Sequence, residues 1–134
     1  MAGLEVVGLG HVAIYVSDLA RSMAWYREMF GFEDLWYYDH PNTGTRMQFM
    51  QTHGVIIELV QRGPGRKQRD GIDGTINHLC IQVADIAAAK AELEAKGCTF
   101  VTDIVHDTEL YPNGEKNAML LGPDGEKVQI EEIL

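Results

Sequence analysis

Apolar residues alternate with other residues near the start of the chain and then change to a helical spacing. The alternating segment places Val12, Ile14 and Val16 at every second position, which predicts a strand with one buried face. Asp18 is suited to cap a following helix and Gly31 to end it. Between them, apolar residues lie 4, 3 and 4 positions apart, as on one face of a helix: Leu19, Met23, Tyr26 and Phe30.

The same order of features returns 67 positions later, and the chain has 134 residues. Residues 11–20 read HVAIYVSDLA and residues 78–87 read HLCIQVADIA, so His, Ile, Val and Asp recur at this offset. An offset of half the chain indicates a tandem duplication. The second copy has its own capping residue, Asp85, a weaker apolar stripe and a closing Gly97, which together predict a second helix.

Short extended segments, divided by turns rich in Pro, Asn, Asp and Gly, follow each predicted helix. The predicted strands are 33–39, 45–51 and 54–60 in the first copy and 99–105, 117–121 and 127–133 in the second. Each half therefore reads strand, helix, three strands, which is an α+β arrangement. We expect one domain, with module one at 1–61, a glycine-rich charged linker at 62–75 and module two at 76–134.

In the first strand of each copy, strand parity predicts which side chains point away from the helix. The apolar residues of the first strand leave His11 and Tyr15 on the opposite face. The second copy places His78 and Cys80 on the equivalent face. Two imidazoles related by the duplication, facing one cavity, are a natural beginning for a metal site.

A polar residue also interrupts the last strand of each copy. Glu58 lies inside an otherwise apolar run, where an unpaired charge is unfavourable unless it meets a cation or a metal. Its counterpart in the final strand is Gln129. The spacing is 47 residues from His11 to Glu58 and 51 residues from His78 to Gln129, so the second copy has four extra loop residues.

This arrangement resembles the vicinal oxygen chelate superfamily, which includes glyoxalase I, methylmalonyl-CoA epimerase, ring-cleaving dioxygenases, fosfomycin-modifying enzymes and bleomycin-binding proteins. The resemblance covers nearly the whole chain, and its most specific segments are GHVAI at 10–14, IEL at 57–59, NHL at 77–79 and GPDGEKVQI at 122–130. It implies two tandem βαβββ modules forming a cupped, barrel-like mixed sheet with the helices outside. It also implies a divalent metal ion in the cup.

The metal ligands implied by the resemblance are His11, Glu58, His78 and Gln129. Glu is the commonest residue of the family at the position of Gln129, and an amide oxygen still coordinates a metal but cannot act as a base. Glu131 shares the parity of Gln129 and would replace it only if the strand slipped by two residues. Imidazole and oxygen ligands suit Zn, Ni, Co, Mn or Fe(II), and the sequence does not select among them.

With Glu in the middle strand, the ligand pattern is similar to that of the glyoxalase I and epimerase branch. The resemblance then implies a metal-dependent lyase or isomerase that transfers a proton next to a carbonyl through a metal-chelated enediolate, with Glu58 as the base. One alternative is a metal-free binding protein of the bleomycin-resistance type, which would use stacking side chains such as Tyr15. A dioxygenase is a further alternative.

The substrate of such an enzyme stays open. Tyr15 and Arg62 stand where glyoxalase I relatives typically carry an Arg and an Asn that grip glutathione, so glutathione specificity does not carry over. Arg62 can instead hold an anionic group, and coenzyme A, another thiol or a small dicarbonyl are all candidates. Cys80 shares the face of His78, where we expect a small apolar neighbour of the substrate rather than a reactive thiolate.

Composition narrows the function less than the motifs do. The net charge of −9 disfavours nucleic acid as a partner. The chain has no run of 18 apolar residues and no signal-peptide pattern, so we expect a cytoplasmic protein that does not enter a membrane. Two cysteines outside any spaced motif fit a reducing compartment. The family resemblance implies a homodimer, with the site either within one chain or across the interface.

Overall fold

The computed structural model describes residue 5 and residues 9–65 and 76–134 of the chain. Most of the predicted linker, residues 66–75, lies outside the described residues. Neither helix in the described part is long and apolar enough to span a membrane. The elements are, in order, β1 (Val12–Tyr15), α1 (Leu19–Phe30), β2 (Glu33–Asp39), β3 (Arg46–Thr52), β4 (Val55–Gln61), β5 (Leu79–Gln82), α2 (Ile86–Ala95), β6 (Val105–Asp107), β7 (Glu115–Leu121) and β8 (Lys127–Ile133).

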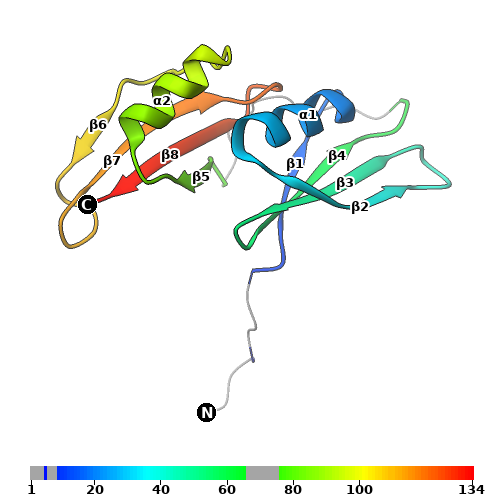
Figure 1. The fold of residues 1–134 in the computed structure, drawn as a ribbon. Helices are drawn as coiled ribbons and strands as arrows, with labels where there is room; N and C mark the ends of the chain where they lie inside the picture. Colours follow the sequence, from blue (N-terminus) through cyan, green and yellow to red (C-terminus); the bar gives the residue numbers. More distant parts are fainter. Residues whose placement is uncertain (1–4, 6–8, 66–75) are drawn as a thin grey trace.

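The strands form two four-stranded sheets with the same topology. Their orders are β1-β4-β3-β2 and β5-β8-β7-β6, and in each the first strand pairs in parallel with the last while the other pairs are antiparallel. The prediction of two tandem βαβββ modules is therefore confirmed, as two open sheets rather than a closed barrel. Both helices lie on the same side of the sheets (Figure 1). We call the opposite side the open face.

The two helices begin in the same way because the same side chains satisfy their first backbone N–H groups. Asp18 and Asp85 cap α1 and α2, and each accepts a hydrogen bond from the N–H three residues further on, at 3.1 and 3.0 Å. Gln61 of β4 and Glu132 of β8 accept from the first N–H of each helix, at 2.8 and 2.9 Å. These bonds fix where each helix leaves its sheet, and the two aspartate caps among them are those that the sequence predicts.

The apolar core is continuous between the modules. One cluster lies under α1 and a second under α2, and Trp25 and Phe30 of α1 contact both. Leu79 and Ile81 of β5 also pack against the first cluster, so the first strand of module two completes the core of module one. Burial of this area is the main stabilising contribution. The fully buried apolar residues include Val16, Tyr26, Met50, Ile57, Leu59, Ala118, Leu120, Val128 and Ile130.

A buried carboxylate, Asp124, joins the two modules from the turn between β7 and β8. It accepts hydrogen bonds from the backbone N–H of Ser17 at 3.0 Å and from the Ser17 hydroxyl. Arg21 donates to the same carboxylate at 3.3 Å, and the hydroxyl of Ser22 donates at 3.4 Å. The side chain of Asp124 is only 3% exposed. It therefore fixes the end of β1 and the start of α1 against module two.

A second buried polar contact lies beside the first. The hydroxyl of Tyr26 donates to the Glu126 carboxylate at 3.1 Å, and Tyr26 itself is fully buried. Burial raises the pKa of Glu126 above its ordinary value, although hydrogen bonds from Asp124 and Tyr26 partly oppose the rise. Burial and the neighbouring carboxylate also raise the pKa of Tyr26. The phenol therefore stays a hydrogen-bond donor.

The segment predicted as a strand at 99–105 is the main local error. Only residues 105–107 form β6, and the preceding residues make an isolated bridge from Phe100 to Leu120. The hydroxyl of Thr102 accepts from the backbone N–H of Met119 at 2.8 Å. The Thr102 hydroxyl thus takes the N–H of Met119, which would bond to a backbone carbonyl in a continuous strand. Regular pairing with β7 begins only at Val105.

Candidate active site

His11 and Glu58 lie together on the open face of module one. His11 immediately precedes β1, and Glu58 lies in β4 between Ala13 of β1 and Phe49 of β3. The distance from His11 Nε2 to Glu58 Oε2 is 3.9 Å, with the side chains 42% and 17% exposed. Two donors that share a metal lie about 3 to 3.5 Å apart, given bonds of about 2.0–2.2 Å. The pair therefore needs only a small closure to bind one ion.

The local sequence explains how a carboxylate comes to lie within an apolar strand. Ile57 and Leu59 are fully buried beneath α1, so the intervening Glu58 must point to the open face. Its charge stays out of the core and meets the imidazole of His11. The parity prediction for β1 is confirmed in the same way, because Val16 is fully buried and Tyr15 on the opposite face is 36% exposed.

The equivalent pair of module two has the same strand positions. His78 immediately precedes β5, and Gln129 of β8 lies opposite Cys80, as Glu58 lies opposite Ala13. The register is therefore the unslipped one, which favours Gln129 over Glu131 as the residue equivalent to Glu58. His78 Nδ1 lies 2.9 Å from Asn77 Oδ1. Donation from Nδ1 to this amide oxygen leaves Nε2 as the lone-pair atom available to a metal.

Convergence of the two pairs on one ion stays a prediction. In the described part of the chain, no group of three or more His, Cys, Asp or Glu side chains is arranged to hold a metal. Gln129, whose amide oxygen is a weaker donor, is the fourth expected ligand. The structure thus brings His11 and Glu58 together directly, and it places His78 and Gln129 at matching positions of the second module.

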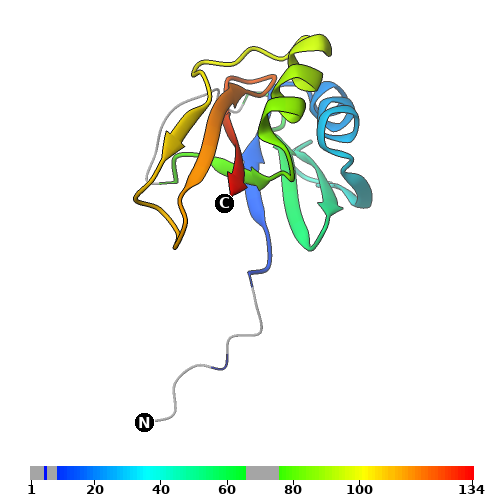
Figure 2. The same cartoon turned by 60° about the vertical axis from the view of Figure 1, so that its left-hand side comes forward.

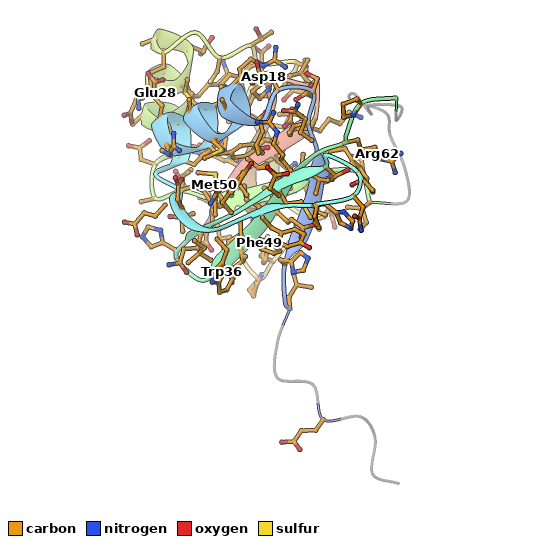
Figure 3. All side chains as sticks on the ribbon, turned by 90° about the vertical axis from the view of Figure 1, so that its right-hand side faces the viewer. Asp18, Glu28, Trp36, Phe49, Met50 and Arg62 are labelled. Carbon is orange, nitrogen blue, oxygen red and sulfur yellow. The ribbon has the colours of Figure 1, made fainter. Side chains whose placement is uncertain are left out.

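Tyr15 and Arg62, predicted to contact substrate, are held together at the far end of β1 and β4. The guanidinium carbon of Arg62 lies 4.7 Å from the centroid of the Tyr15 ring, and Arg62 Nη2 lies 3.5 Å from the Tyr15 hydroxyl. A pocket of about 500 Å³ adjoins Arg62, and Arg46 adds a second guanidinium to its lining. Figure 3 shows Arg62 at this end of the sheet. The lining also includes the carboxylate of Asp39, so the two guanidinium groups leave one net positive charge, which suits an anionic group.

Cys80 faces a markedly acidic environment. Burial raises the pKa of its thiol to about 12, with further contributions from the charges of Glu131 and Glu115. The thiol is therefore protonated at neutral pH and is not a reactive thiolate, while contact between Cys80 and a substrate stays a prediction.

Sequence reasoning missed a hydrogen-bonded group on the open face of module two. The Tyr111 hydroxyl donates to the two carboxylate oxygens of Glu131 at 3.1 and 3.3 Å, and this bond raises the pKa of Tyr111. Glu115 is almost fully buried beside Asn117, which donates to it, and burial raises the pKa of Glu115. Because Glu115 directly follows a Pro-Asn-Gly turn, where charged residues are ordinarily exposed, the sequence does not predict that it is buried.

An aromatic row on module one was missed as well. The ring of Phe49 lies edge-on to His11, with centroids 5.1 Å apart, and edge-on to Trp36, with centroids 5.6 Å apart. Figure 3 shows Trp36 and Phe49 on the side of the sheet away from α1, whereas Met50 points toward that helix. The alternation of Phe49 and Met50 could have indicated the face of Phe49 in advance.

Two modules of identical topology, each with a histidine at its first strand and a polar residue in its last, define a paired βαβββ fold with a shared open face. The chain belongs to the Glyoxalase/Bleomycin resistance protein/Dioxygenase superfamily, whose family model matches residues 8–130. This confirms the family that the sequence motifs indicate.

Individual relatives agree with this assignment. The chain is 35% identical over 94 residues to an ethylmalonyl-CoA/methylmalonyl-CoA epimerase from Cereibacter sphaeroides, over 66% of this chain and 70% of the relative. It is 26% identical over 124 residues to the uncharacterized protein YwbC of Bacillus subtilis, over 90% of this chain and 94% of that protein. A glyoxalase family protein from Enterococcus faecalis has the same fold, with a TM-score of 0.78 and 21% identity over 94% of this chain and 98% of that one.

Proposed function

We propose that this protein is a metal-dependent isomerase or lyase that moves a proton at a carbon next to a carbonyl group. The observation that carries the proposal is the His11–Glu58 pair on the open face, 3.9 Å apart, which combines a metal donor with a carboxylate able to accept a proton. The similarity to a protein named as an acyl-CoA epimerase supports the isomerase class. It also makes acyl-CoA thioesters substrates to test.

The residues that would hold the divalent ion are His11, Glu58, His78 and Gln129. These imidazole and oxygen donors fit Zn, Ni, Co, Mn or Fe(II). Asn77 would keep the His78 ring in the tautomer that leaves Nε2 available. When bound, such an ion stabilises the negative charge that develops on a carbonyl oxygen as the neighbouring carbon loses its proton.

The chain itself supplies the base and the means to orient the substrate. Glu58 is the carboxylate placed to take the proton, and its side chain is mostly covered between β1 and β3. The amide of Gln129 cannot accept a proton, so the two equivalent positions of the modules have different roles. Arg62, held over the Tyr15 ring, would bind an anionic part of the substrate.

The experiment is replacement of Glu58 by Gln. The variant should keep the fold and lower kcat by roughly 10²-fold or more, because the amide cannot serve as a general base. The assay is exchange of the substrate α-proton with deuterated solvent, first on hemithioacetals of methylglyoxal and then on acyl-CoA thioesters. Glu33→Gln, an exposed change in β2 of the same module, is the matched control and should leave the rate unchanged.

Two results would contradict this assignment. Metal-loaded wild-type protein that exchanges no α-proton on either class of substrate would exclude the proposed reaction. Exchange that continues at the wild-type rate in Glu58→Gln would exclude Glu58 as the base.

A metal-free binding protein of the bleomycin-resistance type is the second candidate. The exposed aromatic side chains of Tyr15 and Trp36, which are 36% and 61% exposed on the open face, favour it because they suit ligand stacking. Metal analysis of protein purified without chelators separates the two candidates. A near-stoichiometric divalent ion excludes the binding protein.

We also propose that the protein forms a homodimer, as expected from the family. Exposed apolar side chains gather around β6 and the C-terminus, where a second copy would cover them. These residues are Val101, Ile104, Val105, Leu110, Ile133 and Leu134.

A further inference from the structure

A β-bulge in module one aims a large aromatic side chain at the candidate site. The register of β2 against β3 shifts between Asp34 and Tyr37, so that Leu35 and Trp36 together face the single residue Phe49. Bulges of this kind redirect a side chain and are common beside active sites. Here the consequence is that Trp36 contacts Phe49 on the open face instead of pointing to the helix side.

The bulge completes a row of three rings that ends at His11, a candidate metal ligand. Trp36 contacts Phe49, and Phe49 contacts the imidazole of His11, each edge-on at 80° between ring planes. Trp36 nevertheless remains 61% exposed, and Tyr38 on the same strand is 49% exposed. Large exposed aromatic surface next to a site is available to contact a bound molecule. We call Trp36 and Phe49 the aromatic wall.

The equivalent surface of module two has the opposite character. In module one, Val60 of β4 pairs with Met47 of β3. The strand register gives Glu131 and Asn117 as the matching pair of module two. After a duplication, these differences mean that the open face is apolar on one side of the site and polar and acidic on the other. A ligand that matches both sides must itself have an apolar end and a polar end.

We propose that the aromatic wall binds a flat, apolar group, such as an aryl ring, attached to the oxygen-bearing part of a small-molecule substrate. The proposal rests on the proposed function, because the oxygens would lie at His11 and Glu58 while the ring packs against Phe49 and Trp36. A second copy of the chain is a poorer occupant. Two aromatic side chains bury about 300 to 500 Å² in total, whereas a stable dimer needs about 800 Å² on each partner.

The test compares two ligands that share the same vicinal oxygens and differ only in the aryl group. Phenylpyruvate and pyruvate are titrated by calorimetry into the full chain, once loaded with Zn(II) and once after treatment with EDTA. Wild-type protein should bind phenylpyruvate at least about tenfold more tightly than pyruvate, because only the former buries a ring. Trp36→Ala should reduce this preference to less than about threefold and leave the affinity for pyruvate unchanged.

Tyr37→Ala is the matched control for this change. Tyr37 is the next residue of β2 and is 54% exposed, but it pairs with Gln48 and faces the helix side. The variant should keep the full preference for phenylpyruvate. A melting curve for each variant establishes that the fold is retained.

Four outcomes would overturn the proposal: a preference below about tenfold in the wild type, no detectable binding of phenylpyruvate, an unchanged preference in Trp36→Ala, or an equal loss in Tyr37→Ala and Trp36→Ala. An unchanged preference in Trp36→Ala, together with a loss of dimer in sedimentation, would assign the surface to a second copy instead. Failure of the proposed function would give a different result. In that case α-proton exchange is absent while the preference for the aryl ligand persists, with or without metal.

Discussion

Replacement of Asp124 by Ala should strongly destabilise the protein, because this one carboxylate connects the two modules. It accepts from the backbone and hydroxyl of Ser17, from Arg21 and from Ser22, and its side chain is 3% exposed. Alanine removes every one of these acceptors. The Ser17 and Ser22 donors then lose their partner in a site that water reaches poorly.

The size of the effect follows from these contacts. A hydrogen bond to a charged group contributes about 1.5–3 kcal/mol, and a buried donor without a partner costs about 1–3 kcal/mol. Arg21 contributes less, since its side chain is 50% exposed and solvent screens it. We therefore expect a loss of about 3–5 kcal/mol in the free energy of unfolding. For a chain of 134 residues this corresponds to a fall in Tm of about 11–18 °C.

The assay is urea and thermal unfolding followed by circular dichroism. Asp34→Ala is the matched control, because Asp34 forms two hydrogen bonds with Arg27 at 3.0 and 2.9 Å but is 43% exposed. Its loss should cost less than about 1 kcal/mol. Zn(II) affinity, measured by competition with a chromogenic chelator, should also fall in Asp124→Ala, because the open faces of the two modules lose their fixed relation.

Equal losses in the two variants would refute the reasoning, since burial and not the ion pair is what distinguishes Asp124. A loss below about 1 kcal/mol in Asp124→Ala would refute it as well, and would show that the apolar core alone holds the modules together.

Two further predictions concern pH and close packing. The pKa of Glu126 is raised above its ordinary value of 4.5, so the folded state holds the proton more tightly and stability falls as pH rises through that folded pKa. Glutamine does not titrate, so the variant does not share this loss. In urea titrations the free energy of unfolding of Glu126→Gln, relative to that of the wild type, should therefore rise from pH 4 to pH 7, and a difference that stays constant over this range would contradict the prediction. Gly63→Ala should destabilise by more than about 3 kcal/mol, because a Cβ there would lie 1.7 Å from the carbonyl oxygen of Thr43. Gly10→Ala, with no atom within 4 Å of the added Cβ, should change the melting temperature little, and similar effects in the two variants would show that the loop simply moves aside.

Local signals predicted most of the fold. Asp18 and Asp85 mark the helix starts because a cap acts on its own first turn, and the strand at 127–133 was predicted with its observed bounds. The strand predicted at 99–105 was wrong because the side-chain hydroxyl of Thr102, in place of a backbone carbonyl, accepts the hydrogen bond from the N–H of Met119 in β7. Contacts of that kind depend on which segments meet, and hydrophobic periodicity does not contain this information.

The candidate site likewise contains residues that local patterns predict and residues that depend on contacts between distant segments. Parity and repeat spacing placed His11 and Glu58 on one face, and the structure brings them to 3.9 Å. The aromatic wall escaped prediction because the bulge that turns Trp36 exists only in the pairing of β2 with β3. Asp124 escaped too, since its Pro-Asp-Gly surroundings read as an ordinary turn while its partner Ser17 is 107 positions away.

The separate hydrogen-bonding of the two sheets has an evolutionary consequence. Among the described strands, each sheet completes its ladder within its own module, and none pairs with a strand of the other module. The halves meet through side chains, and Figure 2 shows the strands of module two, coloured green to red, beside those of module one. A substitution on the open face of one module therefore leaves the backbone pairing of the other intact. Selection could change one half of the cup while the other kept its chemistry, so an ancestral symmetric site could acquire a new substrate one half at a time.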